Sequence, residues 1–383
     1  MKPKGSIRVT STYPHVIKKP LIGVLTCPLG RMGKKTPTIK RRAFRELIIL
    51  SGRMGVTVYM FAPESVNWKN NTVTGATLVK TNGKYRWRDY RFPIPDVVYN
   101  RVPNRQLERQ PAVRVVKEKL INEYHAKYFN PCYLDKWTSY CWLKQSLEIL
   151  PHLPETHQLN INSFNEMIAQ YDCVYIKLKT GSVGKGIIRI NKINDHFLMT
   201  SKNEEGYHSE VSNQGIESSP LIQKLCNSGR YIIQRGIDLA RYQNRIFDVR
   251  TLVQKDIRGK WCLTGTAVRA APLNAHLTHV PNGGQAFPLK TVLLQLLHDE
   301  KRVTNLIKQL VQFAIKVAES LEKYSGHQFG EVSLDIGLDR DMHIWLIEVN
   351  SKPFRFDEKE IRYLSRRRIV EYARHISSVR IEK

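Results

Sequence analysis

A pair of acidic residues near the carboxyl end constrains the fold of this chain most strongly. Residues 330–350 hold two runs in which apolar side chains alternate with others, and this pattern indicates two strands with one buried face. If the turn centres on residues 341–342, Asp335 lies opposite Glu348, and Asn350 lies on the same face. Oxygen ligands of this kind suit Mg²⁺, so the hairpin predicts a magnesium site. The alternative is an exposed hairpin face with scattered acids, which conflicts with the apolar residues that flank both acids.

A glycine-rich turn between two strand-like runs is the second informative feature. Gly181, Gly184 and Gly186 lie within six residues, and Lys177 lies on the run before them. Glycines allow backbone N–H groups to approach an anion closely. The spacing is neither that of a Walker loop nor that of a dinucleotide fingerprint, so a plain β-turn is the alternative. The carboxylate hairpin downstream favours a phosphate-binding loop.

The rest of the chain indicates a mixture of helices and strands. Residues 20–125 show strand, helix and strand patterns in the order of a βαβ unit, which predicts a small α/β domain. Asn82 and Gly83 mark a hairpin turn within it. A long amphipathic helical region, at about residues 291–324, is expected before the carboxylate hairpin.

Composition excludes several classes of protein. A hydrophobic fraction of 42% is too high for a wholly disordered chain. No run approaches the roughly 18 consecutive apolar residues of a membrane-spanning helix, and no signal peptide is recognisable at the front. The six cysteines form no C-x-x-C pair, so neither a zinc site nor a redox pair is predicted. A reduced, intracellular setting is the simplest interpretation.

Basic residues are concentrated at the front of the chain. Residues 1–55 hold 13 Lys and Arg and one acidic residue, and the formal net charge of the whole chain is +27. Such an imbalance attracts nucleic acid, anionic polymers, anionic lipid or a phosphorylated substrate. The alternative is a solvated basic surface, since no nucleic-acid motif accompanies the charge. We expect residues 1–19 to be flexible and residues 356–383 to form a basic helical tail.

Residues 130–355 resemble the ATP-grasp superfamily through motifs in the expected order. Asp335, Glu348 and Asn350, followed by Ser-Lys-Pro, are similar to the magnesium-binding strand pair of that superfamily. The Lys-x-x-x-Gly-Ser-x-Gly run at 177–184 resembles its phosphate-covering loop. The resemblance implies an α/β (α+β ATP-grasp) fold with antiparallel sheets. With the patterns in the rest of the chain, four segments are expected, which are the basic front (1–19), a pre-ATP-grasp α/β domain (20–125), an ATP-grasp domain (126–355, with lobes at about 126–230 and 231–355) and the tail (356–383).

The resemblance also implies a role for individual residues. Asp135 would cap a helix that begins with Lys136, the second phosphate-binding lysine. The nucleotide-binding residues would be Lys136, Lys177, Gly181, Ser182, Val183, Gly184, Gly186, Gln234, Arg235, Gly236, Ile237 and Asp238. Arg250 and Arg269 would be catalytic, by stabilising charge on the transferring group, although each could instead pair with a surface acid. One or two Mg²⁺ ions, or Mn²⁺, would be held by Asp335, Glu348 and Asn350.

Across most of its length the chain further resembles the YheC/YheD group of endospore-coat-associated proteins. The supporting runs are Pro20–Cys27, Phe129–Pro131, Asp135–Trp137, Leu153–Thr156 and Leu346–Pro353. The resemblance implies an ATP- and Mg²⁺-dependent ligase that joins a carboxylate to an amine through an acylphosphate and is connected with spore coat formation. Its substrates would be small-molecule or peptide acids and amines, the acids carrying extra negative charge.

A second hypothesis is a non-catalytic spore-associated protein, with a vestigial nucleotide site and a basic surface that binds polyanions. Either protein would reside in the cytoplasm, such as that of the mother cell of a sporulating bacterium, or on the spore coat. The residues leave open whether the chain is an enzyme, which acid and amine it uses, and its oligomeric state.

Overall fold

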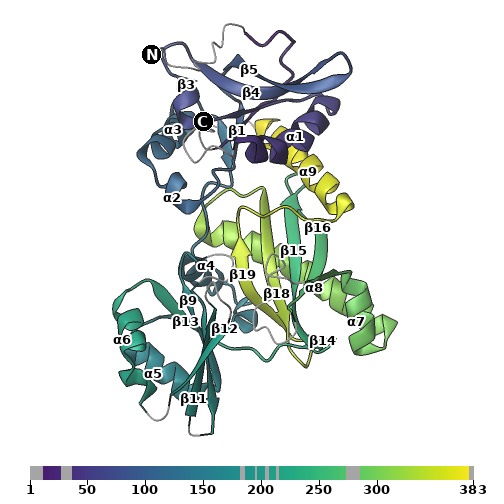
Figure 1. Cartoon of the computed structure of the whole chain (residues 1–383). Helices are drawn as coiled ribbons and strands as arrows, with labels where there is room; N and C mark the ends of the chain where they lie inside the picture. Colours follow the sequence, from purple (N-terminus) through teal and green to yellow (C-terminus); the bar gives the residue numbers. More distant parts are fainter. Residues whose placement is uncertain are drawn as a thin grey trace.

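The computed structural model describes residues 12–26, 37–181, 186–194, 196–202, 207–212, 215–272 and 285–378. These residues form three sheets, which follow one another along an elongated molecule (Figure 1). The sheet formed by the first part of the chain lies at one end, and the sheet that carries the carboxylate hairpin lies in the middle.

The first sheet is mixed and has helices on both faces. Its strands are β1 (Leu21–Leu25), β2 (Thr57–Phe61), β3 (Val66–Asn67), β4 (Thr72–Thr81), β5 (Lys84–Pro93), β6 (Val97–Asn100) and β7 (Lys127–Phe129). The order is β3-β4-β2-β1-β6-β7, with β5 paired to β4. Strands β2, β1, β6 and β7 run parallel, whereas β3, β4 and β5 are joined by antiparallel pairs. The helices of this part are α1 (Pro37–Arg53), η1 (Pro63–Ser65), α2 (Arg105–Glu108) and α3 (Pro111–Asn122). The predicted turn joins β4 and β5, where Asn82 and Gly83 both have positive φ angles, as a tight hairpin requires.

The second sheet is antiparallel and packs against two helices on one face. Its strands are β8 (Thr156–Gln158), β9 (Cys173–Leu178), β10 (Ile188–Ile193), β11 (His196–Lys202), β12 (Tyr207–Ser212) and β13 (Tyr231–Arg235). The order is β12-β11-β10-β9-β13-β8. The helices of this part are α5 (Ile161–Gln170), η3 (Ile216–Ser218) and α6 (Pro220–Asn227). Phe164 of α5 and Ile222 of α6 are buried against Ile176 of β9, so this lobe has its own core.

The third sheet carries the carboxylate hairpin at its edge. Its strands are β14 (Arg241–Tyr242), β15 (Arg245–Lys255), β16 (Trp261–Ala270), β17 (Gln285–Phe287), β18 (Glu331–Leu338) and β19 (Ile344–Asn350). The order is β17-β16-β15-β18-β19, and β14 pairs with β15. The helices of this part are α4 (Lys136–Leu143), η2 (Leu150–His152), α7 (Leu289–Leu297) and α8 (Glu300–Ser325). The largest hydrophobic cluster lies between these helices and the sheet.

The long helical region expected at about residues 291–324 consists of two helices, α7 and α8. His298 ends α7 in the left-handed conformation, with a φ of 52°. Asp299 then caps α8, because its side chain accepts hydrogen bonds from the backbone N–H groups of Lys301 and Arg302 at 2.7 and 3.0 Å. The amphipathic period continues through both helices, and for that reason the pattern alone conceals the break.

The expected basic tail is a packed helix, α9 (Lys359–Ser378). It lies between α1 and the third sheet (Figure 1), and its Val370 and Tyr372 belong to the core of the first sheet. Its arginines are engaged within the fold, since Arg366 pairs with Glu46 at 2.7 Å and Arg368 donates to backbone carbonyls of β16. The last part of the chain therefore joins the first sheet to the third.

Part of the expected flexible front is held against the first sheet. Thr12 forms a bridge to Arg91, and the ring of Tyr13 lies 5.0 Å from that of Phe92. Residues 1–11 lie outside the described residues.

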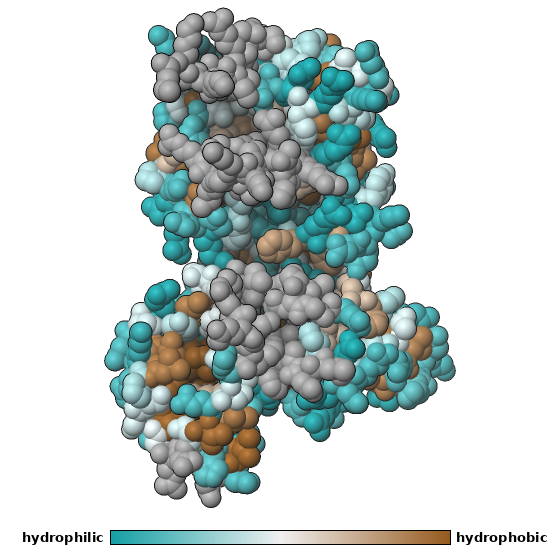
Figure 2. Space-filling model, in the orientation of Figure 1, coloured by the Kyte–Doolittle hydropathy of each residue, from teal (hydrophilic) through white to brown (hydrophobic). Residues whose placement is uncertain are grey.

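Hydrophilic residues cover much of the face in Figure 2, whereas apolar residues gather on the lower left lobe. Among the described helices, none has the length and apolar character needed to cross a membrane.

Candidate functional site

The carboxylate hairpin places Asp335 opposite Glu348, as predicted. The two strands do not keep a single register from the turn to this pair. Near the turn Ile336 pairs with Leu346, and a β-bulge leaves Ile347 without a partner before the next pair is reached. Ile347 and Glu348 are half-buried between the buried Leu346 and Val349, and all four residues line one cavity. The bulge thus sets the register in which Glu348 faces Asp335.

Two arginines on neighbouring strands hold Asp335. The Oδ1 atom of Asp335 lies 2.6 Å from Nη1 of Arg250 and 2.9 Å from Nη2 of Arg269. Arg269 also donates to both carboxylate oxygens of Asp248, at 2.8 and 2.9 Å. Burial would raise the pKa of Asp335, but the two guanidinium groups outweigh burial and hold that pKa below its ordinary value. The arginines therefore pair with buried acids, and not with surface acids.

Lys136 joins three separate parts of the chain. It is the first residue of α4, which Asp135 caps as expected by accepting from the backbone N–H of Thr138 at 3.0 Å. Its Nζ donates to Oε1 of Glu348 at 2.9 Å and to the backbone carbonyl of Gly181 at 2.8 Å. The predicted phosphate lysine, the start of the glycine turn and one predicted metal ligand thus meet at one point.

Lys177 lies in the same region on β9. Its Nζ donates to Oε1 of Gln234 on β13 at 2.6 Å, and the amide of Gln234 donates to Oγ1 of Thr156 on β8 at 2.9 Å. Burial, with the nearby charge of Lys136, lowers the pKa of Lys177 to about 8, although Glu348 opposes this shift. A second anion beside Lys177 would favour its charged form.

These side chains line one cavity between the second and third sheets. Its charged and amide side chains are Lys136, Lys177, Gln234 and Glu348, and its apolar walls come from both lobes. The other lining residues are Leu134, Ser139, Tyr140, Leu143, Leu153, Pro154, Thr156, Ile232, Leu346, Ile347 and Val349. An apolar slot with a few convergent polar groups is the usual form of a small-molecule site, and two lysines suit phosphates.

Several residues that the resemblance assigns to the nucleotide have other contacts. The Arg235 guanidinium lies over the rings of Tyr171 and Trp345, at 5.1 and 5.4 Å. The backbone N–H of Gly236 donates to the carbonyl of Cys173 at 2.7 Å. Asp238 forms an exposed ion pair at 2.8 Å with a partner from the turn of the carboxylate hairpin, Arg340. Like Ile237, these residues do not line the cavity described above.

The glycine turn is described only at its two ends. Ser182, Val183 and Gly184 lie outside the described residues. Gly186 has a φ of 70°, and a Cβ at this position would meet Leu178 at 2.8 Å. The return of the turn into β10 therefore requires glycine for both conformational and steric reasons.

The donor set fits a divalent metal only when further oxygens are supplied. Asp335 and Glu348 face each other, and Asn350 lies opposite Ser333 in the same strand pair. No group of three or more His, Cys, Asp and Glu residues that could hold a metal occurs in the described part of the chain. Two carboxylates and an amide suit an ion that shares its other positions with water and phosphate oxygens, as Mg²⁺ does.

Sequence reasoning did not identify two residues of this site. Asp248 holds Arg269, and the Asp248-Val-Arg250 alternation was a signal that both side chains share one strand face. Thr156 anchors Gln234, and its position at the end of a Leu-Pro-Glu-Thr run gave no indication of that contact. Both contacts depend on strand neighbours that are far apart along the chain.

Comparison with known proteins identifies the family. Residues 125–376 match the model of the YheC/D-like ATP-grasp family. The endospore coat-associated protein YheD of Bacillus subtilis (strain 168) is 28% identical over 365 residues, which cover 94% of this chain and 79% of that protein. The endospore coat-associated protein YheC of the same strain is 21% identical over 314 residues, which cover 81% of this chain and 84% of that protein.

Solved structures share the fold at low sequence identity. The D-alanine-D-alanine ligase from Coxiella burnetii is similar with a TM-score of 0.51 and 12% identity, over 94% of this chain and 96% of that one. The D-cycloserine synthetase DcsG is similar with a TM-score of 0.50 and 13% identity, over 92% of this chain and 99% of that one. These likenesses confirm the predicted fold class. Together with the family match over most of its length, they show that this chain belongs to the YheC/D-like ATP-grasp family.

Proposed function

We propose that this chain is an ATP- and Mg²⁺-dependent ligase that joins a carboxylate to an amine. The observation that carries the proposal is the contact of Lys136 with both Glu348 and the carbonyl of Gly181, at 2.9 and 2.8 Å. This contact joins three groups for which the resemblance implies related roles: a phosphate-binding lysine, a metal-binding carboxylate and the start of the phosphate-covering turn. A structural salt bridge alone would not require the adjoining cavity or the second lysine.

Lys136 and Lys177 would neutralise the phosphates of ATP. Lys177 is well suited to this task because burial leaves its charge poorly solvated, so an anionic phosphate would stabilise its charged form. The apolar walls of the cavity, among them Leu143 and Ile232, would accept the base. Gln234 would remain a hydrogen-bonding partner of Lys177 at the wall of the cavity.

Asp335, Glu348 and Asn350 would hold Mg²⁺, which supplies charge neutralisation on the phosphate oxygens. For Glu348 this requires exchange of a partner, because Lys136 now occupies its Oε1 atom. Movement of Lys136 from Glu348 onto a phosphate would release the carboxylate for the metal.

The reaction would proceed in two balanced steps. A substrate carboxylate oxygen attacks the γ-phosphorus of ATP, forming a C–O–P bond while the bond to ADP breaks. The amine nitrogen then attacks the acyl carbon, a C–N bond forms, inorganic phosphate leaves, and the proton of the amine passes to solvent. Arg269 and Arg250 would stabilise negative charge on the transferring group in both steps, because the pair with Asp335 fixes their direction.

The alternative function is a non-catalytic spore-associated protein with a vestigial nucleotide site. One observation favours this alternative. Both carboxylates predicted to bind the metal already have cationic partners: two arginines pair with Asp335, and Lys136 pairs with Glu348. The two curated relatives are named as endospore coat-associated. We propose the same association for this chain under either function, with the basic front available for polyanions.

The test uses hydroxylamine as the amine, because it traps acylphosphates as hydroxamates. Purified protein with Mg²⁺ and ATP is offered a panel of monocarboxylic acids, dicarboxylic acids, amino acids and short peptides. The proposal predicts ADP and hydroxamate in equal amounts with at least one class of acid. Glu348→Gln should lower the rate about 100-fold or more, whereas Glu319→Gln, on the exposed side of α8, should not change it. ADP formation that never depends on an acid would contradict ligation.

A further inference from the structure

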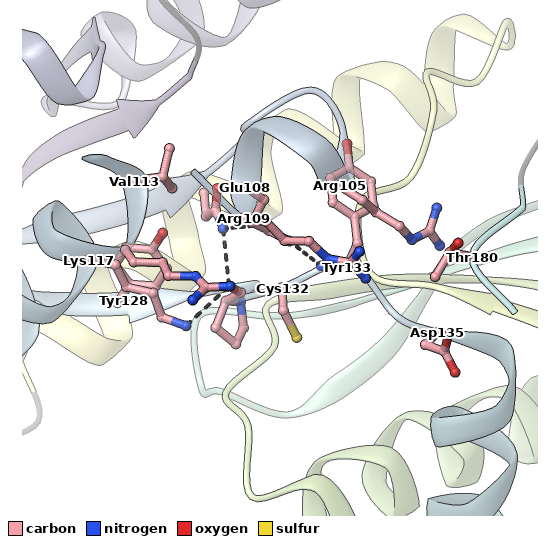
Figure 3. A pocket seen from close by; sticks show the side chains of 13 residues that line it. Arg105, Glu108, Arg109, Val113, Lys117, Tyr128, Cys132, Tyr133, Asp135 and Thr180 are labelled. Carbon is pink, nitrogen blue, oxygen red and sulfur yellow. Dashed lines mark hydrogen bonds between the residues drawn. The ribbon is translucent and has the colours of Figure 1, made fainter. Parts of the chain in front are cut away.

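A second cavity lies between the first sheet and α4. It is lined by side chains from α2, α3, β7 and the segment that leads into α4 (Figure 3). Four of its lining residues are basic, namely Arg105, Arg109, Arg114 and Lys117. None of its lining residues also lines the cavity that holds Lys136 and Lys177. The basic cavity, as we call it, is therefore a separate site.

The acids of the basic cavity do not neutralise its arginines. Glu108 accepts from Nδ2 of Asn100 at 2.9 Å and from the backbone N–H of Tyr133 at 2.7 Å, and it pairs with the buried Lys352. Asp135, the other acid of the lining, caps α4. Arg109 and Arg114 are exposed and form no ion pair with any residue that the structure describes. The cavity thus keeps an excess of positive charge.

Two buried donors in the basic cavity have no partner among the described residues. The hydroxyl of Tyr128 is one, in a residue that is 6% exposed, and Nε of Arg105 is the other. Nη2 of Arg105 donates to the carbonyl of Leu134 at 2.6 Å, which fixes the plane of its guanidinium. Buried polar groups are nearly always satisfied, so two unpartnered donors among unpaired arginines indicate a ligand with acceptor oxygens.

The basic cavity adjoins the proposed ATP site through two neighbouring pairs of residues. Asp135 lines the basic cavity, and the next residue, Lys136, contacts Glu348. Thr180 lines it, and the next residue, Gly181, accepts from Lys136. Consecutive Cα atoms are about 3.8 Å apart. The two sites are therefore separated by little more than the thickness of one chain segment.

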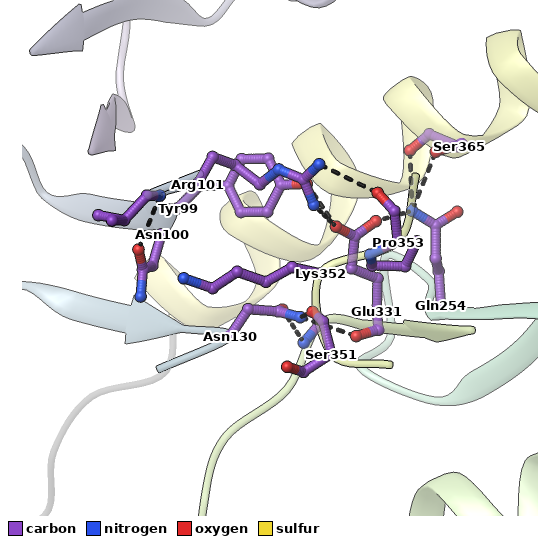
Figure 4. Close-up of polar contacts among 12 residues, drawn as sticks. Tyr99, Asn100, Arg101, Asn130, Gln254, Glu331, Ser351, Lys352, Pro353 and Ser365 are labelled. Carbon is purple, nitrogen blue, oxygen red and sulfur yellow. Dashed lines mark hydrogen bonds and ion pairs between the residues drawn. The ribbon is translucent and has the colours of Figure 1, made fainter. Parts of the chain in front are cut away.

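The wall of the basic cavity is also tied to the metal-binding strand (Figure 4). Lys352, which pairs with Glu108, lies two residues beyond Asn350. Asn130 donates to the carbonyl of Glu331 at 2.7 Å and also to that of Ser351. These buried contacts hold the first sheet rigidly against β18 and β19. A ligand in the basic cavity would thus have a fixed position relative to the site of phosphoryl transfer.

We propose that the basic cavity binds a second anionic group, a phosphate or a carboxylate, of the acid substrate, at a distance from its reacting carboxylate. This inference rests on the proposed ligase function and names the substrate class. Arg109 and Arg114 supply planar forked donors that match such groups, and Tyr128 supplies a hydroxyl donor. The acid substrates would then carry at least two negative charges. The second anionic group would lie in the basic cavity, beyond the reach of Lys136 and Lys177.

The experiment is calorimetry on the full chain, saturated with Mg²⁺ and a non-hydrolysable ATP analogue so that the nucleotide site is filled. Inorganic phosphate and succinate serve as the two probes. The variants are the double substitution Arg109→Gln with Arg114→Gln, and the single substitution Tyr128→Phe. Arg86→Gln with Arg88→Gln is the matched control, because it removes two exposed arginines from β5 of the same sheet.

Wild type and the control should bind at least one probe equally, and the probe that binds more tightly identifies the group. The double variant should bind it about tenfold or more weakly, and Tyr128→Phe several-fold more weakly with no loss of thermal stability. Failure of both probes to bind, or unchanged affinity in either variant, overturns the proposal. If the ATP analogue itself does not bind, the ligase proposal fails. The same titrations without nucleotide still decide the anion site.

Discussion

Asp335 and Glu348 lie opposite each other on adjacent strands, yet each has its own set of cations. Arg250 and Arg269 approach Asp335 from the sheet, whereas Lys136 approaches Glu348 from the start of α4. The partners of Asp335 are fixed by strand pairing, since Arg250 is its direct neighbour in register. The partner of Glu348 lies on a separate helix, so it can exchange more readily.

Arg269 should be important for stability as well as for chemistry. Arg269→Met would remove the bidentate contact to the buried Asp248 and one contact to Asp335, and we expect the free energy of unfolding to fall by about 3 kcal/mol or more. Urea denaturation measures the change. Arg258→Met removes an exposed pair with Asp256 and should cost less than about 1 kcal/mol. Similar losses in the two variants would show that the Arg269 pair is not a buried structural contact.

Lys177 should make ATP binding depend on pH. Its pKa is lowered to about 8 in the free protein, and bound phosphates favour the charged form. Protein with neutral Lys177 must therefore take up a proton when ATP binds, so affinity should be constant below pH 8 and fall up to about tenfold per pH unit above it. Calorimetry from pH 7 to 9.5 measures this. Lys177→Arg should flatten the profile, and a flat wild-type profile would contradict the assignment.

Gly186 should be intolerant of a side chain. Gly186→Ala introduces both a left-handed alanine and a contact at 2.8 Å with Leu178, so we expect a loss of about 1–2 kcal/mol in unfolding free energy. The matched control is Gly52→Ala on α1, where a Cβ meets nothing within 4 Å. Helix propensity predicts that the control gains up to about 1 kcal/mol. Chemical denaturation should therefore give opposite signs, and equal signs would refute the steric explanation.

The local parts of the fold could be predicted from sequence. Alternation of apolar residues identified the carboxylate hairpin, and Asn82-Gly83 identified the β4–β5 turn. The bulge at Ile347 has no such signal, because Ile347 fits either side of a strand. The break between α7 and α8 was missed for a similar reason, since His298 and Asp299 interrupt a period that continues on both sides.

The composition of the site could be predicted better than its contacts. The hairpin pattern selected Asp335 and Glu348, the family resemblance selected Lys136, and the structure brings the three residues close together. The contact between Arg269 and Asp335 depends on the pairing of β16 with β15, and the spacing of residues along the chain does not reveal that pairing. The basic cavity was also missed, because Arg109 and its neighbours resemble ordinary solvated helix charges until α2 and α3 are placed beside β7. Whether the nucleotide contacts assigned to residues 235–238 form remains a prediction.

The most direct test of the central claim is the affinity for ATP measured by calorimetry with and without Mg²⁺, on wild type and on Asp335→Asn. We expect Mg²⁺ to strengthen ATP binding to wild type tenfold or more, and Asp335→Asn to remove most of this difference while the protein remains folded. Circular dichroism checks the fold of both proteins. Folded wild type that does not bind ATP, or that binds it equally well without Mg²⁺, would contradict the proposed ATP- and Mg²⁺-dependent ligase.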